Sequence, residues 1–206
     1  FLDMLLGLDF DNTLVSYDEV FRLLAINERV IDSSWTGNKL QLKNYLLSEP
    51  NGEFKWQLLQ GKAYGKFMHK ANLFSGAKDF LLQCKKKKIP ICIVSHKTIF
   101  GIHDEEKIPL RDEALKWMHK QGFFKELGIR KDRVYFEPTI EAKINRINSL
   151  NCSYFIDDLL EILTHPILSD SVNKILFREF SNNKIPNQIF SFNNWNNFST
   201  DFFTEC

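Results

Sequence analysis

Apolar and polar residues follow one another along this chain in blocks, and the first block is the most informative. Leu5, Leu6 and Leu8 form a short apolar run that ends abruptly in the polar segment DFDNT at residues 9–13. This pattern is typical of a strand that is buried on both faces and carries carboxylates at its carboxyl end. Unpaired carboxylates beside a core are costly, so Asp9 and Asp11 predict a cation or a chemical task at this point.

The second block, residues 15–74, has apolar residues at helical spacing and no stretch that predicts a strand. A first helix is predicted around Val20–Leu24, a second over residues 38–47 before the turn EPNG, and a third from Phe54 onward. We therefore expect a small helical domain inserted directly after the acidic segment.

From Ser75 onward, predicted helices and strands alternate. Ser75 and Thr139 are each expected to cap a helix, and strands are predicted at residues 89–94, 133–136, 153–156 and 174–177, the last of these closing the series. Such alternation is typical of an α/β fold, with a Rossmann-like parallel sheet sandwiched by helices. The expected division is a core of residues 1–14 and 75–206 and a helical cap of residues 15–74.

Composition narrows the class of protein. The chain has 206 residues with a formal charge of +1, which gives no general attraction to nucleic acid or to an anionic membrane. No window approaches the ~18 apolar residues of a membrane-spanning helix. The cysteines lack metal-ligand spacing and are interpreted as free thiols in a reducing cytoplasm; they are Cys84, Cys92, Cys152 and Cys206.

Two other clusters have two interpretations each. Lys62, Lys66 and Lys70 recur at every fourth position, as either a solvated helix face or a basic wall that attracts an anionic substrate. The aromatic residues of the tail either pack an edge of the sheet or form a ligand box; they are Phe190, Phe192, Trp195, Phe198 and Phe202.

Polar residues that can perform chemistry gather where predicted strands end, which is where functional residues of parallel sheets meet. They are Asp9 with Asp11, Ser95, Asp157 with Asp158, and Lys143 in the first turn of a nearby helix. Carboxylates select a hard cation, here Mg²⁺, and an amine and a hydroxyl beside it suit phosphoryl oxygens. A carboxylate can itself attack phosphorus, and a second one can act as acid and base.

These residues resemble, in order, the four motifs of the haloacid dehalogenase superfamily. The segment DFDNT is similar to its first motif, Ser95 to its second, Lys143 to its third, and the pair Asp157-Asp158 to its acidic fourth. The stretches VSHKT and FIDDL are also similar to a little-characterised bacterial branch of that superfamily. The resemblance spans residues 4 to about 180 and implies the fold already expected.

The resemblance also implies roles. Asp9 would be the nucleophile and a metal ligand, and Asp11 the acid and base, which also offers its main-chain carbonyl to the metal. Ser95 and Lys143 would hold the phosphoryl oxygens, and Thr13 would buttress the first loop.

Asp157 and Asp158 complete the implied Mg²⁺ site, and which of the two contacts the ion directly is left open. His96 and Lys97, which follow Ser95, are candidate substrate-binding residues, and so is Thr13. For Ser95 and Lys143, a helix cap and a surface lysine are the alternatives.

The expected function is that of a cytoplasmic, Mg²⁺-dependent phosphohydrolase that acts on a small phosphorylated metabolite through an aspartyl-phosphate. A phosphotransferase or phosphomutase with the same nucleophile is the first alternative, and a non-catalytic protein that binds a phosphorylated ligand is the second. The sequence predicts no nucleic-acid or membrane partner, and it identifies neither the substrate nor the oligomeric state.

Overall fold

The computed structural model describes residues 4–177 and 185–205. The chain divides into two compact units, which are described separately. The first unit contains the described residues of 4–15, 73–97 and 122–205, and the second contains residues 16–72 and 98–121.

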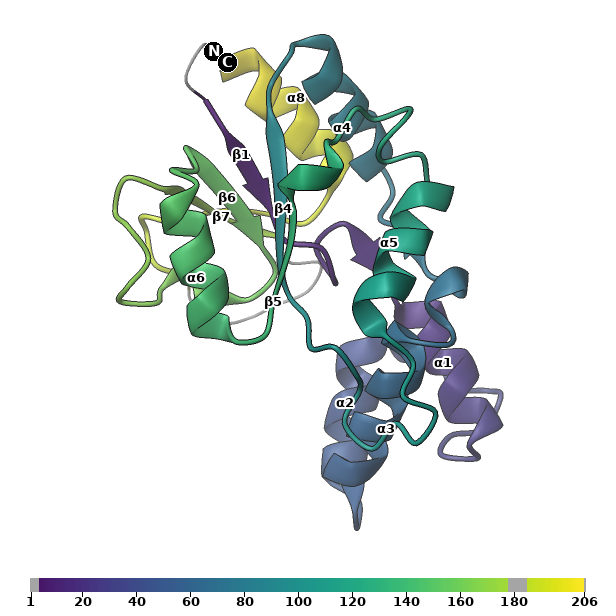
Figure 1. Ribbon diagram of the computed structural model, residues 1–206. Helices are drawn as coiled ribbons and strands as arrows, with labels where there is room; N and C mark the ends of the chain where they lie inside the picture. The colour runs from purple at the N-terminus through teal and green to yellow at the C-terminus, as the bar shows by residue number, and fades with distance from the viewer. Residues whose placement is uncertain (1–3, 178–184, 206) are drawn as a thin grey trace. The chain divides into compact units, whose positions relative to one another are not determined.

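The first unit is built on a six-stranded sheet in which every pairing is parallel (Figure 1). The strand order is β5-β4-β1-β6-β7-β8. The strands are β1 (Leu6–Leu8), β4 (Ile91–His96), β5 (Val134–Glu137), β6 (Tyr154–Asp157), β7 (Asn173–Phe177) and β8 (Phe190–Phe192). The predicted α/β class is confirmed, and the sheet has one strand, β8, beyond the four predicted after residue 75.

Strand β1 lies at the centre of the sheet, paired with β4 on one side and β6 on the other. Its small Gly7 is required there, because a Cβ atom would come within 2.5 Å of the Phe155 ring and 2.9 Å of the Cys152 sulfur. The thiols of Cys92 and Cys152 are 3.7 Å apart, and Cys84, Cys92 and Cys152 are all buried and unbridged. Cys206 lies outside the described residues.

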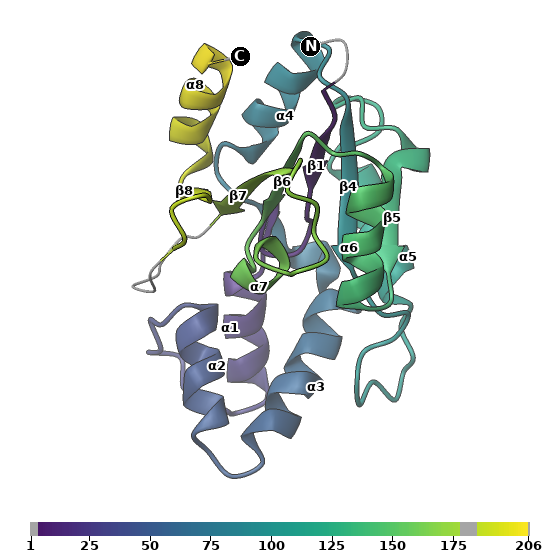
Figure 2. The same cartoon turned by 90° about the vertical axis from the view of Figure 1, so that its left-hand side faces the viewer.

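Helices cover both faces of the sheet. On one face, α6 (Ile140–Ser149) and α7 (Leu160–Leu163) bury their apolar residues against Val94 and Leu176. On the other, α4 (Ala77–Lys86) and α8 (Trp195–Glu205) lie side by side (Figures 1 and 2). Thr139 caps α6 as predicted, because its side chain accepts a hydrogen bond from the Ala142 N–H.

The aromatic tail packs against the core, as one of its two interpretations has it. The rings of Trp195, Phe198 and Phe202 lie 5.0, 5.4 and 5.6 Å from the ring of Phe80 in α4. Trp195 also lies 5.6 Å from Phe177 in β7, so the last helix is fixed to the sheet by ring contacts. Burial of such large rings is among the strongest contributions to packing in a domain of this size.

The second unit is helical. It contains α1 (Asp18–Asn27), α2 (Lys39–Leu47), α3 (Gly52–Tyr64), the 3-10 helix η1 (Met68–Lys70) and α5 (Leu110–Lys120). Asn38 and Gln41 form a reciprocal capping box at the start of α2. The core of the unit contains the stacked rings of Phe21 and Trp56, with centroids 4.8 Å apart. Short strands β2 (Val15–Ser16) and β3 (Asn72–Leu73) pair where the chain passes between the units.

Three local features differ from expectation. Ser75 does not cap α4. Gly76 takes the N-cap position with a φ of +84°, and a Cβ atom at residue 76 would come within 2.5 Å of the Asn196 side chain. Residues 98–121, expected in the core, group with the helical insertion. Within residues 15–74, where no strand was expected, β2 and β3 are present.

The lysines at 62, 66 and 70 do not share one helix face, because α3 ends at Tyr64. Lys62 and Lys66 instead form ion pairs with Glu28 and Glu106. Among the described residues, no helix has the length and apolar character needed to cross a membrane.

Candidate active site

The site begins where β1 ends. The Asp9 N–H donates to the carbonyl of Ile156 over 2.9 Å, which extends the pairing of β1 with β6 by one residue and brings Asp9 beside Asp157. The chain then turns sharply: Asn12 has a φ of +62°, and the N–H groups of Leu14 and Val15 both donate to the carbonyl of Phe10. Asparagine tolerates this left-handed conformation better than most residues, so the DFDNT segment folds back at the edge of the sheet.

Lys143 joins the two strand ends. Its ammonium lies 2.7 Å from Asp9 Oδ1 and 2.6 Å from Asp157 Oδ2, and only 2% of its side-chain surface is exposed. The first turn of α6 places it there, because Thr139 begins the helix and the Lys143 N–H donates to the Thr139 carbonyl. Lys143 is therefore a buried bridge between carboxylates, and the alternative of a surface lysine is excluded.

Burial and charge perturb both partners of this bridge. The pKa of Asp9 is raised from 3.8 to about 7, because the effects of burial and of the neighbouring Asp157 together exceed the opposing effect of Lys143. Burial alone would lower the pKa of Lys143, but the carboxylates of Asp157 and Asp9 outweigh it, and the pKa lies above its ordinary value. Lys143 is thus a permanent positive charge at this point.

Asp9, Asp157 and Asp158 form a cluster suited to a metal ion, because each offers a carboxylate oxygen and these atoms lie within 4.8 Å of one another. Three carboxylates exceed the single positive charge of Lys143, so the cluster retains a deficit of positive charge. An all-oxygen donor set is the kind that Mg²⁺ prefers. The residues present therefore fit a hard divalent cation.

Thr13 supports the first loop, as predicted. Its buried hydroxyl donates to Asp9 Oδ2 over 3.0 Å and lies 3.5 Å from Asp158 Oδ1. The carbonyl of Thr13 accepts a hydrogen bond of 3.1 Å from the indole N–H of Trp195. No sequence pattern indicates this contact, because the aromatic residues of the tail predict packing and not a hydrogen bond to the site.

Ser95 lies at the same edge of the sheet. Leu8 of β1 is level with Ile93 of β4, so Ser95 lies just beyond the end of β1. Its hydroxyl is buried and is the one buried side-chain polar atom, among the residues described, for which no hydrogen-bond partner is present. A buried hydroxyl without a partner is costly, so Ser95 has an unused donor at this edge of the sheet. It belongs to strand β4, so the helix-cap alternative is excluded.

Asp11 and Lys97 form a second ion pair. The Lys97 ammonium lies 2.7 Å from Asp11 Oδ2, with 2% of the lysine side chain exposed and 15% of the aspartate side chain exposed. The Asp11 carboxylate is not part of the metal-type cluster, which agrees with a role other than side-chain ligation. His96 is exposed, and its Nε2 atom lies 3.2 Å from the carbonyl of Pro138.

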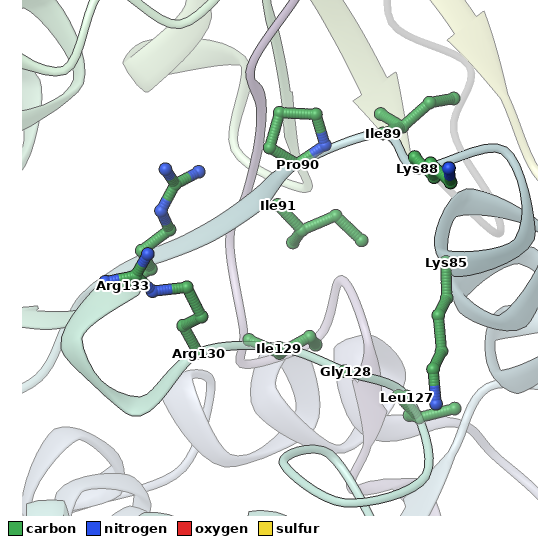
Figure 3. A pocket seen from close by; sticks show the side chains of 10 residues that line it. All are labelled: Lys85, Lys88, Ile89, Pro90, Ile91, Leu127, Gly128, Ile129, Arg130 and Arg133. Atoms are coloured by element: carbon green, nitrogen blue, oxygen red, sulfur yellow. The ribbon is translucent and has the colours of Figure 1, made fainter.

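One pocket of the first unit lies away from these groups. It has a volume of about 240 Å³ and is lined by basic residues around Ile89 and Ile91. Figure 3 shows Arg130 and Arg133 on one side of it and Lys85 on the other. Ile91 is the first residue of β4, whereas Ser95 is near its end, so the pocket lies at the opposite end of the strand from the candidate site.

Solved structures share this arrangement of strands and helices. A haloacid dehalogenase-like family hydrolase of Streptococcus pneumoniae matches with a TM-score of 0.58 at 13% identity, covering 98% of this chain and 97% of the other. A HAD-superfamily hydrolase of Ehrlichia chaffeensis matches with a TM-score of 0.54 at 15% identity, covering 97% and 95%. The chain has the fold of the haloacid dehalogenase-like hydrolases.

A third such hydrolase, from Xanthomonas campestris, matches this HAD-like chain with a TM-score of 0.53 at 10% identity, covering 98% and 95%. The similarity therefore extends over almost the whole of each chain. At the level of sequence, no protein-family model and no curated protein matches.

Proposed function

We propose that the protein is a Mg²⁺-dependent phosphomonoesterase that acts on a small phosphorylated metabolite. The observation that supports this best is the bridge of Lys143 between Asp9 and Asp157, with the unpartnered hydroxyl of Ser95 at the same edge of the sheet. An ammonium and a hydroxyl at one sheet edge suit the oxygens of a phosphoryl group, and a carboxylate beside them suits attack on its phosphorus.

In the proposed reaction, Ser95 donates its hydroxyl hydrogen to a phosphoryl oxygen and Lys143 supplies positive charge beside Asp9. An oxygen of Asp9 forms a bond to phosphorus while the bond from phosphorus to the ester oxygen breaks. Asp11 gives its proton to the departing oxygen. Asp11 then takes a proton from a water molecule as that water attacks phosphorus, which frees phosphate and restores the Asp9 carboxylate.

Mg²⁺ would be held by Asp9, Asp157 and Asp158, and by the main-chain carbonyl of Asp11. When bound, it would offset the negative charge of the phosphoryl group and of the carboxylates. Thr13 would hold Asp9 in place through the hydrogen bond between its hydroxyl and Oδ2.

The second unit is proposed to act as a cap. Each of its two segments begins directly after a site segment: Ser16 comes after DFDNT and Val15, and Thr98 comes after Lys97. A cap excludes water and favours a small substrate over a polymer. The proposed partner is therefore a small metabolite in the cytoplasm. Neither nucleic acid nor a membrane is proposed as a partner.

The test is hydrolysis of p-nitrophenyl phosphate with Mg²⁺, followed by a panel of metabolite phosphates. We expect Asp9→Asn to lower kcat by at least ~10⁴-fold, because the amide cannot act as the nucleophile. Phosphate release that is unchanged in Asp9→Asn, or unaffected by EDTA, would refute the proposal. A phosphoenzyme that turns over only when a second hydroxyl compound is added would instead identify a phosphotransferase.

A further inference from the structure

Lys97 is a buried lysine to which the proposed reaction assigns no role. Its residue exposure is 3%, and it lies directly beyond the end of β4, two positions after Ser95. Burying a long cationic side chain is costly unless a negative charge compensates it. The contacts of its ammonium therefore indicate what the residue is for.

Both ends of Lys97 are fixed by contacts within the first unit. Its backbone N–H donates to the Glu137 carbonyl over 2.9 Å, which continues the pairing of β4 with β5. Its ammonium lies 2.7 Å from Asp11 Oδ2 and 5.9 Å from the centre of the Phe10 ring. Phe10 is fully buried and packs edge-on against Phe123, with ring centres 6.3 Å apart. The ammonium thus holds a fixed position beside the Asp11 carboxylate.

Within this ion pair the aspartate is the more exposed partner. Only 2% of the Lys97 side chain is exposed, whereas 15% of the Asp11 side chain is. Lys143 is as deeply buried as Lys97, so burial alone does not separate their roles. Lys97 differs because its ammonium contacts Asp11, the proposed acid and base, and not the proposed nucleophile.

We infer that Lys97 is a positioning residue for Asp11. It holds the Asp11 carboxyl group where the leaving-group oxygen departs, so that the proton passes from the carboxyl group to that oxygen as the bond from phosphorus breaks. This inference rests on the proposed function, since it assigns Lys97 to the acid and base of that reaction. It replaces the sequence-based expectation that Lys97 binds substrate itself.

The experiment compares two aryl phosphates that differ only by a nitro group, p-nitrophenyl phosphate and phenyl phosphate. Phenolate is the more basic leaving group, so its departure depends more on a proton delivered in time. We expect Lys97→Met to lower kcat/KM by about tenfold for p-nitrophenyl phosphate and by about 100-fold for phenyl phosphate, in line with the usual size of acid catalysis. KM should change little for either probe.

The matched control is Lys78→Met, which removes a lysine from an exposed ion pair with Glu126. It should leave both values of kcat/KM unchanged. Lys97→Arg retains the charge and the donors, and it should recover activity to within about fivefold of the wild type. If Lys97→Met does not yield folded protein, Lys97→Gln is judged by the same ratio of the two losses.

A double-mutant cycle isolates the route of the effect. In an Asp11→Asn background, Lys97→Met should cause no further loss, because a residue that acts only through Asp11 has nothing left to position. A further loss in that background, or equal losses for the two probes, would overturn the inference while leaving the proposed function intact. A wild-type protein that hydrolyses neither probe nor any metabolite phosphate would instead refute the proposed function.

Discussion

Two buried lysines flank the DFDNT segment, and they differ in how their charge is matched. Lys143 bridges two carboxylates, Asp9 and Asp157, whereas Lys97 forms an ion pair with Asp11. With Asp158 included, the first cluster contains three carboxylates beside one ammonium, and the second is built on the pair of Lys97 and Asp11. Buried negative charge without a positive partner is costly, so a bound cation would stabilise such a cluster. The first cluster is thus suited to receive a metal ion, and the second to hold one carboxyl group still.

Breaking the Lys143 bridge should have the largest effect. Lys143→Met keeps the length of the side chain but leaves Asp9 and Asp157 side by side without their buried charge partner. We expect kcat/KM for p-nitrophenyl phosphate to fall by about 10³-fold, and the free energy of unfolding to fall by about 3 kcal/mol. Steady-state kinetics and urea unfolding measure the two. A loss no larger than that of Lys97→Met would contradict the distinction between the clusters.

Mg²⁺ should stabilise the protein through the first cluster only. At a concentration of 100 times its Kd, a ligand that binds the folded state alone adds about 2.7 kcal/mol, so Mg²⁺ should raise Tm by several degrees. Asp157→Asn should abolish this gain, whereas Lys97→Met, which leaves the cluster intact, should retain it. A gain that is lost in Lys97→Met but retained in Asp157→Asn would show that the metal binds elsewhere.

The gain from Mg²⁺ should also depend on pH. The pKa of Asp9 is raised from 3.8 to about 7 by burial, with a contribution from Asp157. The pKa of Asp9 is higher in the metal-free folded state than in the unfolded chain, so protonation of Asp9 stabilises the folded state. This contribution is fully present below pH 3.8 and is lost as pH rises through about 7. Mg²⁺ binds the ionised form, so its Tm gain should be largest above pH 7 and should shrink toward pH 5.5. A gain that is constant over this range would be contrary to this prediction.

The smallest expected effect concerns the support of the first cluster. Trp195→Phe retains a large ring against Phe80 but removes the indole N–H that donates to the Thr13 carbonyl. Loss of one such bond should lower the free energy of unfolding by about 1–2 kcal/mol and kcat by a few-fold, because Thr13 holds Asp9. Phe80→Leu is the comparison: it disturbs the same ring cluster without removing the bond. If it affects kcat as much, packing and not the hydrogen bond is responsible.

The sequence predicted the parallel sheet and the edge on which the polar residues meet. Both follow from local pattern, since an apolar run followed directly by acids is typical of a buried strand that ends at a site. The fold and the placement of Lys143 beside Asp9 agree with that prediction. The roles of these residues stay predictions.

Other features depend on contacts between distant segments, which no local pattern reveals. The cap of α4 is Gly76 and not Ser75, because Asn196 approaches that turn closely. Strand β8 was not predicted, because its sequence FSF lacks the continuous apolar run of the inner strands. Its Phe190 is 52% exposed. The pairing of Lys97 with Asp11 joins the end of β4 to the loop after β1, and it was invisible for the same reason.

The hydrogen bond from Trp195 to the Thr13 carbonyl has a consequence for the order in which the chain is made. The first loop is synthesised early, but β1 gains its neighbours only when residues 91–93 and 154–156 have emerged. The Thr13 carbonyl gains its hydrogen bond only when residue 195 has also emerged. During translation the acidic loop therefore lacks this hydrogen bond until α8 has left the ribosome. A ribosome-bound chain that stops before Trp195 would contain every proposed catalytic residue but not the contact that supports the first loop.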